Sequence, residues 1–167
     1  TGGTASIYST SKAGAVMITG TNVTFNDVAS NDNAASGGTH AQAMGGAVYL
    51  DSTSNTANHD GQKRVLKASA TFNVTKDTTY AGNKVFGVDA YSDTYGSYAK
   101  TGGGFMYMDR GGEANFNIAD GVTLKIGKDG ETDANTDSIA SAIRGNHAEY
   151  GENTINKEGL GTLTVNG

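Results

Sequence analysis

The chain of 167 residues contains no cysteine, no proline and no tryptophan. The absence of cysteine excludes disulfide bridges, thiol chemistry and cysteine-ligated zinc. The absence of proline leaves every backbone N–H free to join a β-ladder, as strands paired on both sides require. Charged residues make up only 17% of the sequence, against about a quarter in an ordinary globular domain.

Positive charge and long apolar runs are also scarce. Lysine and arginine number 12 against 17 aspartates and glutamates, which gives a formal net charge of −5. Phosphate binding needs clustered basic residues, so we expect no nucleic-acid partner. No apolar run approaches the roughly 20 residues that span a bilayer, so we expect no membrane insertion of this segment.

Glycine, asparagine, threonine and serine take the place of the missing charges, and glycine alone accounts for 25 residues. They separate short apolar runs rich in β-branched and aromatic residues, which is the signal for strands and turns. The length suits one domain, and we expect a single unit over residues 1–167.

Two short motifs recur along the chain. The first is a glycine followed by four apolar residues, and its three copies begin at Gly14, Gly46 and Gly104. A Phe-Asn pair follows each copy, at Phe25-Asn26, Phe72-Asn73 and Phe116-Asn117. Repeated units of this size bury their apolar faces against copies of themselves. The pattern predicts stacked β-coils about 4.8 Å apart, with the phenylalanines piled inside and the asparagines forming an amide ladder at the turn.

The spacing of the motifs predicts two insertions. The glycine precedes the phenylalanine by 11 residues in the first unit, 26 in the second and 12 in the third. The difference places an inserted loop over residues 52–64, and a second break in the repeat covers residues 82–101. Further strands are expected within residues 121–126 and 161–165, whereas residues 138–144 fit either a helical turn or a strand.

The closing residues 155–167 read I-N-K-E-G-L-G-T-L-T-V-N-G. They resemble the passenger repeat of bacterial autotransporters, I-x-K-x-G-x-G-T-L-T-[LV]-x-G, and residues 117–127 are similar to the strand-turn-strand that often precedes it. Residues 45–48 more weakly resemble repeats of polymorphic outer-membrane proteins, although asparagine here follows phenylalanine directly. The resemblance implies an all-β, single-stranded right-handed parallel β-helix. It also implies a passenger segment of a longer protein, exported by the type V route to the Gram-negative cell surface.

No catalytic or metal-binding motif stands out. The three histidines, His40, His59 and His147, are isolated in polar stretches. Asp51 and Asp109 fit a pair of glycosidase carboxylates, but their equivalent places in the repeat favour stacked turn residues. The segments 31–33 and 129–133 carry oxygen ligands without a calcium-loop spacing, so solvated turns are favoured. We expect no cofactor and no metal.

One segment that breaks the repeat is a candidate binding surface. It concentrates tyrosines together with aspartates. A tyrosine side chain has a flat apolar face and a polar tip, which suit contact with sugars or protein surfaces. The candidate residues are Asp89, Tyr91, Asp93, Tyr95 and Tyr98. An alternative, equally favoured, is a tyrosine-rich cover packed over the sheet.

The sequence therefore predicts a non-enzymatic, surface-exposed segment that acts in adhesion or self-association. Its expected partner is a host or bacterial surface protein or glycan, or another copy of itself. One alternative is a filament or surface-layer subunit that assembles end to end. A less favoured alternative is a polysaccharide-active β-helix enzyme.

Overall fold

The computed structural model describes residues 4–5, 10–37, 42–55, 64–87, 90–92, 97–99, 101–142 and 150–166. These residues form β-strands joined by turns, and they include no α-helix. The protein is therefore all-β. None of the described segments is a helix long and apolar enough to cross a membrane.

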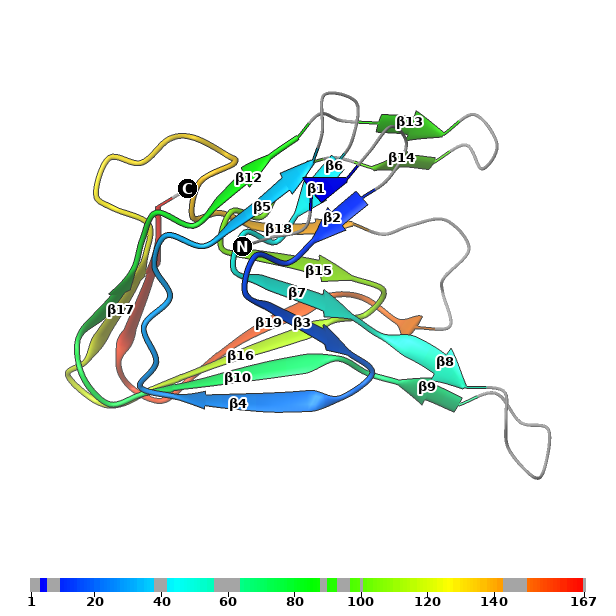
Figure 1. Ribbon diagram of the computed structural model, residues 1–167. Helices are drawn as coiled ribbons and strands as arrows, with labels where there is room; N and C mark the ends of the chain where they lie inside the picture. The colour runs from blue at the N-terminus through cyan, green and yellow to red at the C-terminus, as the bar shows by residue number, and fades with distance from the viewer. Residues whose placement is uncertain are drawn as a thin grey trace.

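Three parallel sheets carry most of the structure (Figure 1). Sheet I contains β3 (Val16–Thr19), β7 (Val48–Asp51), β15 (Met106–Asp109) and β18 (Ile139–Ala142). Sheet II contains β4 (Asn22–Asn26), β10 (Ser69–Val74), β16 (Glu113–Ile118) and β19 (Thr154–Glu158). Sheet III contains β11 (Thr78–Tyr80), β17 (Thr123–Ile126) and β20 (Thr162–Val165).

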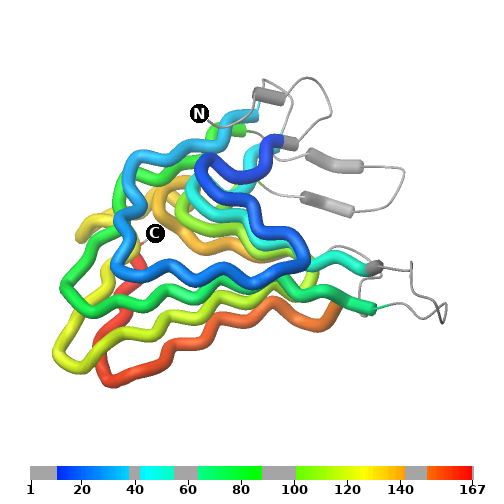
Figure 2. The backbone as a smooth tube through the Cα atoms, turned by 60° about the horizontal axis from the view of Figure 1, so that its bottom comes forward, coloured from blue at the N-terminus to red at the C-terminus, as the bar shows by residue number. Residues whose placement is uncertain are grey.

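Strands of the same pass along the chain lie at the same level of each sheet. Sheet I has the order β18-β15-β7-β3, and sheet II has the matching order β19-β16-β10-β4. We call these levels layers 1 to 4, from β3 and β4 in layer 1 to β18, β19 and β20 in layer 4. Figure 2 shows the successive passes of the backbone side by side, from blue to red.

Smaller sheets lie beside this stack. Two of them are parallel: β1 (Thr4–Ala5) with β5 (Ala34–Gly37) and β12 (Lys84–Phe86), and β2 (Thr10–Lys12) with β6 (Gln42–Met44). The other two are antiparallel pairs: β8 (Thr53–Asn55) with β9 (Arg64–Leu66), and β13 (Ala90–Ser92) with β14 (Ser97–Ala99).

The core lies between the sheets and is built from rows of like residues. Phe25, Phe72 and Phe116 occupy one register column of sheet II. Their ring centroids are 4.9 Å and 5.1 Å apart in successive layers, so the rings stack as the repeat predicts. Phe72 and Phe116 are buried, whereas Phe25 in layer 1 is only partly buried. Side chains alternate between the two faces of each strand, so this row faces inward.

The three motif glycines also form a column. A Cβ on Gly14 would lie 2.0 Å from the carbonyl oxygen of Gly46, and one on Gly46 would lie 2.1 Å from that of Gly104. Any side chain at these positions would clash with the backbone of the next layer, so only glycine fits. The sharp turn comes just before, where Gly45 and Gly103 have φ angles of +68° and +73°.

The insertion over residues 52–64 contains β8 and ends at the first residue of β9, its antiparallel partner, and residues 56–63 lie outside the described residues. The second insertion was placed too early, at residue 82. Strand β12 pairs in parallel with β5, and its Val85 is buried, so the departure from the layers comes after β12.

Residues 139–142 do not form a helical turn, because β18 pairs in parallel with β15. The spacing of its isoleucines fits both a helical turn and a strand. The segment forms a strand because it pairs with the edge of β15 in layer 3.

Candidate functional site

The outer side of sheet II is a continuous polar surface. Its residues alternate with the buried rows of the core, and all are exposed or half-buried. This polar face consists of Asn22, Thr24, Asn26, Ser69, Thr71, Asn73, Glu113, Asn115, Asn117, Thr154, Asn156 and Glu158. It offers amides and hydroxyls at the spacing of the layers, with Glu113 and Glu158 as its charged members.

Hydrogen bonds between layers organise the polar face. Asn73 Nδ2 donates to Asn26 Oδ1 at 2.7 Å, and Asn117 Nδ2 donates to Asn73 Oδ1 at 3.3 Å. Asn156 Nδ2 donates to Asn115 Oδ1 at 2.8 Å. The expected asparagine ladder is therefore present, but its side-chain bonds join neighbouring strands of sheet II and do not lie at a turn. In all three bonds the donor belongs to the later layer.

The corner that follows sheet II is held by an acidic side chain. Asp27 accepts hydrogen bonds from the hydroxyl of Thr75 at 2.6 Å and from its backbone N–H at 2.7 Å. These two bonds, the hydroxyl first, stabilise the carboxylate and lower the pKa of Asp27. Asp77 takes the same role one layer on, where it accepts the N–H of Thr123 at 2.7 Å.

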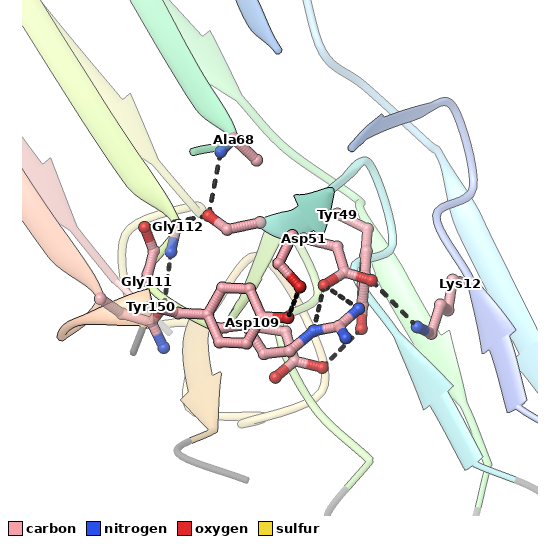
Figure 3. A network of polar contacts seen from close by, with 12 residues as sticks. Lys12, Tyr49, Asp51, Ala68, Asp109, Gly111, Gly112 and Tyr150 are labelled. Carbon is pink, nitrogen blue, oxygen red and sulfur yellow. Dashed lines mark hydrogen bonds and ion pairs between the residues drawn. The ribbon is translucent and has the colours of Figure 1, made fainter. Parts of the chain in front are cut away.

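Asp51 and Asp109 lie on the outer side of sheet I, in register at the ends of β7 and β15, and both are buried (Figure 3). Arg110 Nε donates to Asp51 Oδ1 at 2.6 Å, and Lys12 Nζ lies 3.4 Å from Asp51 Oδ2. The hydroxyl of Tyr49 donates to Asp109 Oδ2 at 2.9 Å. We call these five residues the carboxylate network.

Aromatic rings surround the carboxylate network. Tyr49 stacks on Tyr107 with centroids 5.7 Å apart, and the Lys12 ammonium lies 4.7 Å from the Tyr49 ring centroid. The Arg110 guanidinium lies 5.6 Å from the ring centroid of Tyr150. Burial tends to lower the pKa of Arg110, but its hydrogen bond and charge interaction with Asp51 raise this pKa overall.

The carboxylate network joins side chains of neighbouring layers. A glycosidase pair must reach both sides of a sugar bond, whereas Asp51 is buried and bonded to two cationic side chains. Asp51 and Asp109 are in register at the strand ends, as the expectation of stacked turn residues predicts, but their burial was not anticipated. A signal for the tyrosine pair was present in the sequence, since tyrosine takes the same place in two copies of the glycine motif.

A second polar row, half-buried at Asn33 and buried at Asn83 and Asp137, was not anticipated. Asn33 Nδ2 donates to Asn83 Oδ1 at 2.9 Å, and Asn83 Nδ2 donates to Asp137 Oδ1 at 2.9 Å. Asp137 also accepts the backbone N–H groups of Gly82 and Asn83, each at 2.8 Å. The three side chains belong to successive passes of the chain, at a corner where the sequence shows no repeated motif.

The tyrosine-rich candidate surface is only partly described. Tyr91 and Tyr98 are cross-strand partners in the β13–β14 pair. Asp89, Asp93 and Tyr95 lie outside the described residues, as do the three histidines. The binding role of this segment stays a prediction.

Residues of both calcium candidates are engaged in polar contacts within the protein. Asn31 Oδ1 accepts the N–H of Ala81 at 3.0 Å, and Asp129 pairs with Lys125. Within the described segments, no group of three or more histidine or acidic side chains is arranged to hold a metal ion.

The chain matches no family model, no curated protein and no solved structure.

Proposed function

We propose that this chain is a right-handed parallel β-helix whose polar face mediates adhesion or self-association at a bacterial cell surface. The matching strand order of sheets I and II supports a single coil that climbs one layer per turn. Right-handed crossovers between parallel strands prevail in about 98% of cases, which supports the hand. In this proposal the chain is a non-enzymatic, exported segment that works outside the cell.

The observation that carries the proposal is the polar face itself. Its amides and hydroxyls repeat with the layers and are held in register by hydrogen bonds such as that between Asn26 and Asn73. Each group alone offers a weak contact with a glycan, a protein or a second polar face. A rigid row makes many such contacts at once, and linked weak contacts raise avidity by about 10² to 10⁴.

Clustering of beads coated with the protein tests this function. The triple variant Thr71→Ala, Asn115→Ala and Asn156→Ala removes three of the four side chains in the central row of the polar face, with Thr24 kept, and leaves the inward residues unchanged. We expect clustering, or binding to target cells, to fall at least about tenfold, because several contacts are lost together. The matched control, Thr79→Ala with Thr164→Ala, alters sheet III and should leave clustering unchanged.

Circular dichroism must show that both variants keep their β-structure. Undiminished clustering by the folded triple variant would reject the polar face as the adhesive surface. Equal losses in the triple variant and the sheet III control would reject it as well.

A further inference from the structure

Sheet II ends on two edge strands, β4 in layer 1 and β19 in layer 4. An edge strand carries N–H and C=O groups that point away from its sheet and can pair with another strand. The register through β10 and β16 relates these two edges residue by residue. Ile155 falls in the column of Val23, Lys157 in that of Phe25, and Glu158 in that of Asn26.

The asparagine ladder gives the two ends opposite hydrogen-bonding character. The amide oxygen of Asn26 faces layer 2, where it accepts from Asn73. Its amide nitrogen therefore faces away from the stack. At the other end the same column finishes in Glu158, a carboxylate that only accepts when ionised. One end offers a donor and the other offers an acceptor.

The apolar surfaces of the two ends also complement each other. Layer 1 has an open hollow of about 130 Å³, lined in part by Val16, Phe25 and Val28. Layer 4 exposes 48% of Ile155 and 81% of Leu160, which are large apolar side chains to leave in water. Leu160 follows the sheet II strand in its layer, as Val28 does in layer 1.

We propose that layer 4 of one molecule stacks on layer 1 of a second copy, so that sheet II continues from one chain into the next. In this contact Asn26 donates to Glu158, Ile155 packs on Val23, and the Lys157 ammonium lies over the Phe25 ring as a cation–π pair. The contact joins two different surfaces and leaves both outer ends free, so it builds open linear chains. The inference rests on the layered coil of the proposed function and uses Asn26 and Glu158 of the polar face, but not its central row.

Sedimentation of the full chain over a range of concentrations tests the proposal. Wild-type protein should form linear oligomers whose mean mass rises with concentration. Asn26→Asp keeps the acceptor for Asn73 within the molecule but opposes the Glu158 carboxylate of the next copy. Like charges that face each other across an interface oppose association, so association should weaken at least about tenfold.

The double variant Asn26→Asp with Glu158→Lys restores opposite charges and should recover association to within a few-fold of wild type. This rescue separates an interface effect from a folding defect. A wild-type protein that stays monomeric at every concentration overturns the proposal, as does an Asn26→Asp variant that associates like wild type.

The adhesion test is independent, because the central row of the polar face is absent from the end contact as proposed. If the triple variant loses bead clustering but still forms linear oligomers, both proposals are supported. If the triple variant retains both bead clustering and linear oligomers, only the adhesive role of the polar face is rejected.

Discussion

Phe72 has a stacked ring on each side, at 4.9 Å from Phe25 and 5.1 Å from Phe116. It also contacts Tyr80 and Phe105 at 6.1 Å and 5.7 Å between centroids. Phenylalanine thus occupies the same inward position in three layers, and Phe72, the middle one, contacts the most aromatic rings. Aromatic pairs contribute about 0.5–1.5 kcal/mol each beyond their burial.

Replacing Phe72 by alanine should therefore lower the free energy of unfolding by about 3–5 kcal/mol, through lost burial and the cavity left behind. Phe25→Ala is the matched control, since that ring is partly buried and stacks on one side only. Its cost should be clearly smaller in chemical denaturation. Equal costs at both positions would contradict the stacked core.

Asp27 makes stability depend on pH through its bonds with Thr75. Its pKa is lower in the folded state than in the unfolded chain, where an aspartate titrates at about 3.9. Its contribution is thus complete above that value and is lost as pH falls through the folded pKa.

Thr75→Val removes the hydroxyl donor and should raise the pKa of Asp27, as followed by NMR titration of its side-chain carboxyl. Thr79→Val, at an exposed position of sheet III, should leave this pKa unchanged. An unaltered Asp27 pKa in Thr75→Val would contradict the proposed origin of the shift.

At the scale of the strand, the close approach of successive layers decides which residues are tolerated. A Cβ on Gly46 would meet two backbone oxygens, at 2.1 Å from Gly104 and 2.5 Å from Lys84. Backbone on both sides cannot move without breaking its own ladder. Gly102 is less confined, because the nearest atom to its Cβ would be that of Ala140 at 3.3 Å.

Gly46→Ala should consequently lower the free energy of unfolding by about 3 kcal/mol or more, or prevent folding. The added methyl group would clash with backbone atoms that cannot shift without disturbing their own hydrogen bonds. Gly102→Ala should cost much less. Thermal and urea unfolding of the two variants measure the difference. A Gly46→Ala protein as stable as wild type would show that the layers are not in this register.

Sequence analysis located the strands of the two recurring motifs and also β17 and β20, which lie within the predicted ranges 121–126 and 161–165. The glycine motif and the Phe-Asn pair mark sheets I and II in layers 1 to 3, because each inward position repeats. Strand β12 was missed and β18 was left ambiguous. Each of these segments forms a strand only because it pairs with the N–H and C=O groups of a strand in the neighbouring layer.

The candidate sites were less accessible to sequence reasoning. Burial of Asp51 depends on Lys12 and Arg110, which lie 39 and 59 residues away along the chain. Such partners are brought together by the stack and not by any local spacing. The row of Asn33, Asn83 and Asp137 was hidden for the same reason.

At the scale of the whole molecule, contacts between layers hold the protein together. Each strand is only a few residues long, and such short strands are not stable alone. The stability of the protein therefore depends on the interfaces between neighbouring layers, as in other repeat architectures. The central claim is therefore that equivalent residues of successive passes lie directly above one another.

The absence of cysteine in the chain allows a direct test of this claim by disulfide trapping. Asn26 and Asn73 are register partners in adjacent layers, so Asn26→Cys with Asn73→Cys places the two Cα atoms about 4.8 Å apart. Disulfides form at Cα separations of about 4.4–6.8 Å. Asn26→Cys with Asn117→Cys spans two layers, about 9.6 Å, which is beyond that limit.

Under mild oxidation of the folded protein, the account predicts rapid intramolecular cross-linking of the first pair and none of the second, as judged by intact mass and thiol counting. A first pair that stays reduced, or two pairs that cross-link equally, would contradict the stacking of layers.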